Sequence, residues 1–429
     1  MRRSTFRRRT AAAVVAVTTA ALALTTAPGT ATASGDDRPH RWTGAWGAAH
    51  QAPVDVPGWP RTWSVDGFTD QSVRQVVRVA AAGERLRIRV SNEYGARPLR
   101  VVAATVGRTG DGAAVRPGTV RTVRFGGDDG IVVPPGRELA SDPVGLPVRA
   151  LERLTVTLHF AGPTGPVGFH PEGLTTTYRA TGDRTRDTSG GPFAGETAYS
   201  YYALSGIDVT GAEARGTVVA FGDSITDGYG STPDADNRYP DQLAERLTEA
   251  RSRLSVVNSG ISGNRLLSDS PCFGVKAKDR FGHDVLNRPG VRKAVVLLGV
   301  NDIGAAGLAD FGCGVAPAVT ASQLIDGHKD LIRQARARGV EVVGATVLPF
   351  KGTGDGYYTE TKDRVRQEVN HWIRTSGAYD AVADTDLALR DPADPARLLP
   401  AYDSGDHLHP NDAGLDALAA AVLPHVTGD

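Results

Sequence analysis

The pattern of apolar and polar positions changes near residue 212. Before this point the chain alternates with a period of two, and runs of this kind at 72–80, 85–90, 99–105, 120–125 and 154–158 are separated by glycine and proline clusters. Strict alternation is typical of strands with one buried and one solvent-facing side. Several such strands without a long helix predict an all-β, sandwich-like domain over residues 38–211.

After residue 212, short apolar runs alternate with amphipathic segments. The apolar runs predict strands at 217–221, 256–257, 294–298, 340–348 and 381–382. The segments between and after them predict helices at 239–254, 320–338, 361–376 and 411–426. Uniformly apolar strands are typical of a parallel sheet that is covered on both faces. Residues 212–429 are therefore predicted to form an α/β domain with helices on both sides of a parallel sheet.

The first 35 residues have the layout of a secretory signal peptide. Five arginines are followed by an apolar, threonine-containing stretch at 10–27 and by the small residues Ala31 and Ala33. This layout predicts a signal peptide over 1–35 and a secreted protein, with a membrane anchor as the alternative and the export route left open. Without those arginines, 43 basic and 48 acidic residues remain, a balance that does not favour nucleic acid or anionic membranes as partners.

The chain has two cysteines, Cys272 and Cys313. An exported protein meets an oxidising compartment, so we expect a disulfide between them, with two buried free thiols as the alternative. No other group of His, Cys, Asp and Glu residues has the spacing of a metal site. Neither a metal nor another cofactor is predicted.

Small and polar residues follow the predicted strands. They occupy 222–228, 258–264 and 299–302, and a further polar loop at 406–410 precedes the last helix. In open α/β sheets, ligands bind beyond the carboxyl ends of the strands. We therefore expect these four loops to meet in one active site.

The residue types in these loops are those of nucleophilic catalysis. Ser224 needs an adjacent base, and histidine, the residue type of His409, is the side chain that most often serves as one. Asp406, three residues before His409, can hold one ring nitrogen and stabilise the imidazolium. The backbone N–H groups of Ser224 and Gly263 and the side-chain amide of Asn301 can form an oxyanion hole.

Alternative roles of several residues in and near these loops remain open. Asp403 competes with Asp406 as the acid, and Gly260 competes with Gly263 as the oxyanion donor. His407 is expected at the surface, pointing away from the site. Three acidic residues are expected to stabilise loops rather than to react: Asp223, Asp227 and Asp302. Four tryptophans near the start of the β-rich region predict core or interface anchors, with sugar stacking as the alternative: Trp42, Trp46, Trp59 and Trp63.

Together the four loops resemble the four blocks of the SGNH/GDSL hydrolase family. The initials of the family name fall, in order, on Ser224, Gly263, Asn301 and His409, over roughly residues 215–428. The resemblance implies a flavodoxin-like sheet of about five parallel strands, metal-free hydrolysis of acyl esters and an acyl-enzyme on Ser224. It also implies that Asp406 completes the triad.

The β-rich half is not part of the minimal family fold. Its combination with the hydrolase half resembles a subgroup of secreted actinobacterial-type esterases. This resemblance implies short-chain or acetyl esters, possibly on polysaccharide, as substrates. Lipid ester hydrolysis, acyl transfer and non-catalytic carbohydrate binding are the alternatives. The pattern leaves the oligomeric state open.

Overall fold

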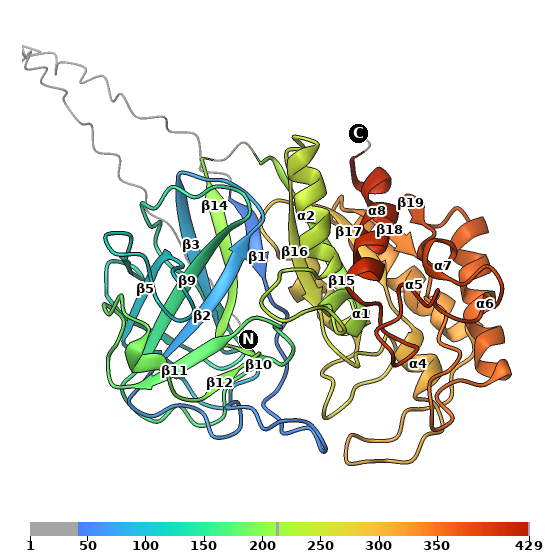
Figure 1. Cartoon of the computed structure of the whole chain (residues 1–429), viewed down its shortest axis with the longest axis horizontal. Helices are drawn as coiled ribbons and strands as arrows, with labels where there is room; N and C mark the ends of the chain where they lie inside the picture. Colours follow the sequence, from blue (N-terminus) through green and yellow to red (C-terminus); the bar gives the residue numbers. More distant parts are fainter. Residues whose placement is uncertain (1–41, 212–213, 428–429) are drawn as a thin grey trace, which may run out of the picture. The chain divides into compact units, whose positions relative to one another are not determined.

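The computed structural model describes residues 42–211 and 214–427, which belong to one compact unit (Figure 1). The signal peptide predicted at 1–35 lies outside the described residues. Among the described residues, no helix is long and apolar enough to cross a membrane. The boundary predicted near residue 212 between two domains stays a prediction.

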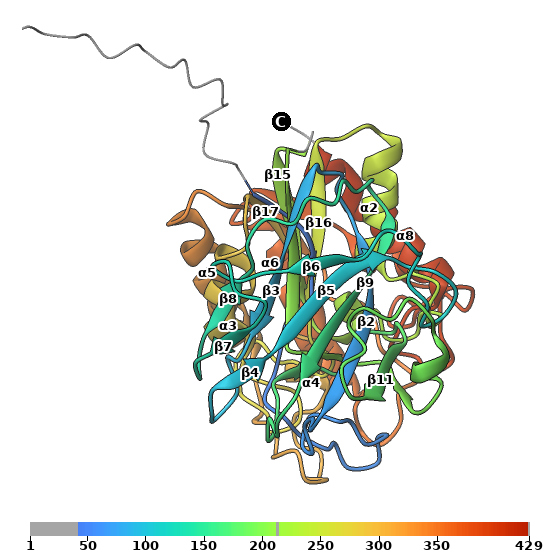
Figure 2. The same ribbon diagram turned by 90° about the vertical axis from the view of Figure 1, so that its left-hand side faces the viewer.

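The N-terminal region is built from antiparallel strands, as predicted (Figures 1 and 2). A four-stranded sheet has the order β1 (Thr43–Gly47), β14 (Leu204–Thr210), β3 (Arg85–Ser91) and β8 (Glu138–Ala140). A six-stranded sheet has the order β12 (Thr197–Ala198), β11 (Thr177–Thr181), β2 (Gln71–Val79), β9 (Glu152–Phe160), β5 (Ala103–Arg108) and β6 (Arg121–Val123). Two small pairs join β4 (Leu99–Val101) to β7 (Ile131–Val133) and β10 (Phe169–His170) to β13 (Tyr201–Tyr202).

The alternation along these strands places their apolar residues in one core. Ile88 of β3, Val156 of β9 and Ile207 of β14 are fully buried in the same cluster, so both larger sheets contribute to it. Burying one such aliphatic side chain contributes about 1.5–3 kcal/mol. The run predicted as one strand at 99–105 divides into β4 and β5, since Leu99–Val101 pairs with β7 and Ala103–Arg108 pairs with β9.

The C-terminal region contains a five-stranded parallel sheet. Its order is β16 (Leu254–Gly260), β15 (Gly216–Gly222), β17 (Val291–Leu297), β18 (Glu341–Ala345) and β19 (Ala381–Ala383). Numbered along the chain, this is the 2-1-3-4-5 order of a flavodoxin-like sheet. The fold class predicted from the sequence is therefore confirmed for this region.

Two groups of helices pack with this sheet (Figure 1). In one group, α8 (Asp412–Thr427) contacts α2 (Tyr239–Glu249) and α7 (Thr385–Leu389). In the other, α5 (Ala321–Arg336) contacts α6 (Glu360–Thr375) and α3 (Ala277–Phe281). Because crossovers between parallel strands are right-handed, reversal of strand order after β16 places α3, α5 and α6 on the opposite face from α2. Shorter helical segments are α1 (Ser224–Asp227), η1 (Gly191–Phe193), η2 (Gly282–Leu286) and α4 (Val300–Gly304).

One predicted helix and one predicted strand end earlier in the structure than the apolar pattern of the sequence predicts. The helix expected at 239–254 stops at Glu249, since Arg251 adopts a positive φ of 52° and Leu254 already pairs with Gly216. The strand expected at 340–348 stops at Ala345. Residues 346–348 are buried without extending the ladder.

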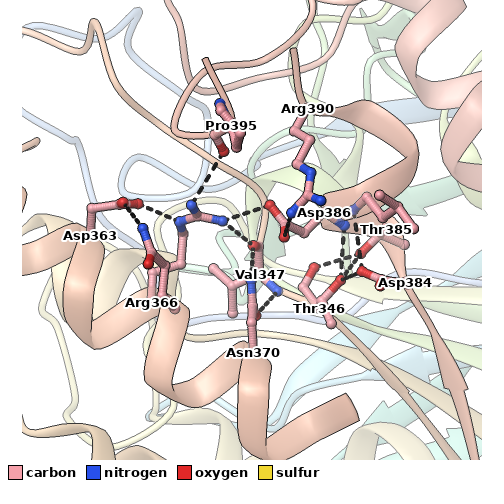
Figure 3. Close-up of polar contacts among 12 residues, drawn as sticks. Thr346, Val347, Asp363, Arg366, Asn370, Asp384, Thr385, Asp386, Arg390 and Pro395 are labelled. Atoms are coloured by element: carbon pink, nitrogen blue, oxygen red, sulfur yellow. Dashed lines mark hydrogen bonds and ion pairs between the residues drawn. The ribbon is translucent and has the colours of Figure 1, made fainter. Parts of the chain in front are cut away.

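A buried arginine of α6 fixes the chain beyond β18 (Figure 3). The Arg366 guanidinium binds Asp363 of the same helix and Asp386 of α7, both at 2.7 Å, and reaches the carbonyl oxygen of Val347 at 3.3 Å. Asn370 holds the N–H and the carbonyl of Val347 at 2.7 and 2.8 Å. Arg366 and Asp386 are both buried, and each has more than one counter-charge: Arg366 also pairs with Asp363, and Asp386 also pairs with Arg374 and Arg390.

Candidate active site

Ser224 lies directly after β15, as the first residue of α1. Asp223 caps this helix, its carboxylate accepting the N–H of Ile225 at 3.1 Å. The first N–H groups of a helix have no partner within the helix, so the N–H of Ser224 belongs to a set that is free to bind an anion. Asp223 is fully buried, and this burial raises its pKa to about 7.

Ser224, His409 and Asp406 form a continuous hydrogen-bonded chain. Ser224 Oγ lies 2.8 Å from His409 Nε2, and His409 Nδ1 lies 2.5 Å from Asp406 Oδ2. The second carboxylate oxygen of Asp406 accepts the backbone N–H groups of Leu408 and His409 at 2.9 and 2.8 Å. Partial burial favours the protonated form of the Asp406 carboxyl. The hydrogen bonds and the charge interaction with His409 outweigh this effect of burial, so the pKa of Asp406 lies well below its usual range. The carboxylate therefore stays ionised beside the imidazole.

The competing acid, Asp403, binds another histidine. Its carboxylate lies 2.6 Å from Nδ1 of His407, whose side chain is exposed, and it also accepts the backbone N–H groups of Gly405 and His407. Asp403 therefore braces the turn before His409, and His407 points to the surface as expected. The structure brings Asp406 to His409 and assigns Asp403 to the neighbouring histidine.

The two candidate glycines have different surroundings. Gly260 donates its N–H to Asn258 Oδ1 at 2.9 Å, so this donor is already used. Gly263 has a φ of 73°, and a Cβ built on it would lie 2.4 Å from the ring of Phe273. Both the positive φ and the close ring exclude a side chain at position 263. This geometry favours Gly263 as a backbone donor.

The Asn301 side chain is held from two sides at the start of α4. Its Nδ2 donates to the carbonyl oxygen of Asn264 at 3.1 Å, and its Oδ1 accepts a hydrogen bond from the Tyr357 hydroxyl at 2.9 Å. These contacts fix which end of the amide is the donor and use one of its two N–H bonds. Tyr357 was not foreseen from the sequence, because it lies 56 residues from Asn301 with no motif between them.

The acidic residues expected to stabilise loops do so. Asp302 accepts the N–H groups of Leu266 and Leu267 at 2.7 and 2.9 Å. Asp227 accepts the N–H and the hydroxyl of Ser262, each at 2.9 Å. Burial raises the pKa of Asp302 to about 6. These carboxylates hold the loop that carries Gly263.

A disulfide joins Cys272 to Cys313, as predicted. The two cysteines form a small apolar cluster with Val56, against which Trp59 and Phe273 pack. Since Phe273 also covers Gly263, the bridge supports the loop beside the proposed oxyanion donor.

The tryptophans serve different purposes. Trp46 and Trp63 are buried in the core of the N-terminal region, as predicted. Trp59 is half-buried, and its ring lies 6.3 Å from Tyr229, whose own ring lies 4.5 Å from His409. Aromatic rings of Trp59 and Tyr229 thus connect the N-terminal region to His409.

Arg265, next to Asn264, is a second residue that the sequence did not single out. It is buried, and its Nε atom has no hydrogen-bond partner among the described residues. Burial lowers the pKa of Arg265, while Asp302 and Tyr357 act in the opposite direction. Its charge lies close to the residues that hold the Asn301 and Asp302 side chains.

One group in the described part of the chain has the ligand types of a metal site: Glu93, His283 and Asp284 lie within 4.8 Å of one another. The Arg280 guanidinium binds the Asp284 carboxylate at 2.9 Å. This cation already supplies the positive charge that the carboxylate needs.

Residues 220–417 match the GDSL-like Lipase/Acylhydrolase family. The chain contains a GDSL-like domain. Ser224, Gly263, Asn301 and His409 all lie within the matched residues. No curated protein matched the chain.

The GDSL-like domain is also similar to solved structures. A carbohydrate acetylesterase family member from Sinorhizobium meliloti has 16% identity and a TM-score of 0.39 over 49% of this chain and 97% of that one. A GDSL-like lipase from Bacteroides thetaiotaomicron has 17% identity and a TM-score of 0.37 over 49% and 88%. A lipase/acylhydrolase from Enterococcus faecalis has 18% identity and a TM-score of 0.37 over 50% and 96%.

Proposed function

We propose that this protein is a serine esterase that hydrolyses carboxylic esters through an acyl-enzyme on Ser224. The observation that carries the proposal is the chain from Ser224 through His409 to Asp406, with contacts of 2.8 and 2.5 Å. A serine hydroxyl becomes nucleophilic when a base takes its proton, and the ionised Asp406 stabilises the imidazolium that results.

In the first half-reaction, Ser224 Oγ attacks the ester carbonyl carbon while His409 Nε2 takes the hydroxyl proton. The carbonyl oxygen becomes an oxyanion, which the N–H groups of Ser224 and Gly263 and the amide of Asn301 stabilise. The tetrahedral intermediate then collapses. The alcohol leaves with the proton from His409, and the acyl group stays on Ser224.

In the second half-reaction, water replaces the alcohol. His409 removes a proton from water, and the resulting hydroxide attacks the acyl carbonyl through a second tetrahedral intermediate. Its collapse breaks the bond to Ser224 Oγ and returns the proton to the serine. The acid leaves and the resting enzyme is restored.

Two features favour short-chain or acetyl esters on an oxygen-rich alcohol such as a polysaccharide. The half-buried Trp59 and the exposed Tyr229 offer ring faces near His409, on which a sugar ring can stack. The signal peptide predicted at 1–35 is consistent with action on an extracellular polymer.

The test is hydrolysis of p-nitrophenyl esters from acetate to palmitate by wild type and Ser224→Ala. We expect turnover that is fastest with acetate and is lost in the variant. Ser231→Ala is the matched control, since it removes a buried hydroxyl from the loop after α1 and should keep full activity. A best rate with palmitate would favour lipid esters, and turnover that persists in Ser224→Ala would refute the mechanism. Product analysis with added alcohol would reveal acyl transfer.

A further inference from the structure

A buried histidine of the N-terminal region lies against the helix that begins with Ser224. His170 of β10 places Nε2 2.9 Å from Oδ1 of Asp227, the last residue of α1. The side chains are 4% and 0% exposed. Water therefore does not screen the electrostatic interaction between these two side chains.

The surroundings of His170 favour its charged form. Its second ring nitrogen, Nδ1, lies 2.8 Å from the carbonyl oxygen of Ala49. A neutral imidazole has a single N–H, which Nδ1 uses toward Ala49, so the 2.9 Å contact of Nε2 with the Asp227 carboxylate is an ion pair only when the ring is protonated. Burial opposes this charge, but the Asp227 carboxylate outweighs burial and raises the pKa of His170 above its ordinary value.

Asp227 also binds the loop that contains Gly263, the proposed oxyanion donor. Its other oxygen, Oδ2, accepts the N–H and the hydroxyl of Ser262, each at 2.9 Å, and Ser262 immediately precedes Gly263. Asn258 Nδ2 holds the carbonyl oxygens at the end of α1. One carboxylate thus links the nucleophile helix, the Gly263 loop and His170.

We infer that His170 is a positioning residue: through Asp227 and Ser262, it fixes the position of the Gly263 backbone N–H. The inference rests on the proposed function, because it assigns a reason for the placement of an oxyanion donor. Oxyanion stabilisation depends on donors held at about 2.7–3.1 Å from the developing charge. Without its counter-ion, the buried Asp227 carboxylate would be left unpaired, and the Ser262–Gly263 loop would shift or the carboxylate would take up a proton.

The other titratable groups around His170 set the direction of its pH dependence. Arg238 opposes its protonation. Burial lowers the pKa of His50 to about 4, so this neighbour is neutral near pH 7. Burial beside Asp227 raises the pKa of Glu172 to about 7, so its charge appears as the pH rises. His170 is charged at pH values below the ordinary histidine pKa, and it loses this charge as the pH rises through its raised pKa. The part of kcat that depends on the charge is lost over the same pH range.

The experiment compares wild type with His170→Gln and with His159→Gln. His159 is a matched control, since it is also a buried histidine of the N-terminal region, but its ring contacts Gln71 and Ser72. We expect His170→Gln to lower kcat about tenfold or more. This loss is smaller than the roughly 10²–10³-fold loss that follows removal of an oxyanion donor itself. KM should change little, and the alkaline fall in kcat that wild type shows should be absent.

Two further measurements separate positioning from stability. Binding of an alkyl trifluoromethyl ketone, which forms an oxyanion on the serine, should weaken by the same factor as kcat in His170→Gln. The double variant His170→Gln, Asp227→Asn has no unpaired buried charge, and its kcat should exceed that of His170→Gln.

Each outcome has one meaning. Equal kcat and inhibitor affinity in His170→Gln and His159→Gln, with an active wild type, would overturn the inference and leave the proposed function intact. A lowered melting temperature with unchanged kcat and inhibitor affinity would also overturn it. An inactive wild type on every ester would instead count against the proposed function.

Discussion

Replacing Tyr357 with phenylalanine should weaken catalysis through Asn301. The Tyr357 hydroxyl donates to Asn301 Oδ1 at 2.9 Å, so it selects the amide orientation in which Nδ2 is available as an oxyanion donor. Burial raises the pKa of Tyr357, which keeps the hydroxyl protonated as a donor. A net hydrogen bond is worth about 0.5–1.5 kcal/mol. Because about 1.4 kcal/mol is a factor of ten, kcat/KM should fall by about 2- to 13-fold.

A double-mutant cycle makes this expectation specific. Asn301→Ala removes the donor itself and should cost about 2.7–4 kcal/mol, or roughly 10²–10³-fold in kcat. If Tyr357 acts only through that amide, adding Tyr357→Phe to Asn301→Ala should change nothing further. The assay is kcat/KM on the best p-nitrophenyl ester for all four proteins of the cycle.

Tyr358→Phe is the control for this cycle. Tyr358 is adjacent in sequence and also half-buried, and its ring packs on Phe350. Its variant should keep the wild-type rate. If Tyr357→Phe lowers kcat/KM by the same factor with and without Asn301, the hydroxyl acts on the substrate directly and the reasoning is refuted. No loss in the single variant would refute it equally.

Three other changes test the triad, the disulfide and the α6 network. Asp406→Asn should lower kcat by about 10²–10⁴-fold, because an amide no longer stabilises the imidazolium, and steady-state kinetics will show it. Replacing Cys272 and Cys313 with alanine opens a link across 41 residues and should cost about 4 kcal/mol in urea-induced unfolding. Asp386→Asn removes one of the two carboxylates that bind the buried Arg366, which keeps Asp363, and should cost about 1.5–3 kcal/mol, measured in the same way.

The triad change and the α6 change each have a control variant. Asp403→Asn alters the acid that binds His407 and should keep far more activity than Asp406→Asn. Asp394→Asn breaks solvent-screened ion pairs with Lys351 and Arg397 and should destabilise the protein much less than Asp386→Asn. Equal effects within either pair would contradict the reasoning. Unfolding of the alanine variant at the wild-type urea concentration would contradict the estimate for the disulfide.

The sequence was sufficient for the parallel sheet because each of its strands is locally apolar. The run 217–221 falls within β15, and the run 294–298 lies in β17 except for its last residue, Leu298. Errors occur at element ends, where a single backbone angle decides the outcome. The positive φ of Arg251 ends α2, and nothing in the period of the preceding residues signals that angle.

The same contrast applies to the candidate site. Ser224, Gly263, Asn301 and His409 lie directly after strands or in a late loop, so strand prediction alone brings them together. Tyr357 and Arg265 act on or near that group through tertiary packing. Their partners are set by how the loop after β18 folds back over α4, and no spacing rule relates these segments.

His170 shows why the contribution of the N-terminal region was the hardest part to predict. It lies in β10, which pairs with β13 over two residues, Phe169 with Tyr202 and His170 with Tyr201. A period-two pattern needs about four residues to be recognised, so a strand of this length gives no signal. Its register nevertheless decides whether the imidazole or the neighbouring phenyl ring faces Asp227, because adjacent residues point to opposite sides of a strand. A region that shows only alternating strands in its sequence therefore places an imidazole 2.9 Å from Asp227, at the end of the helix that begins with Ser224.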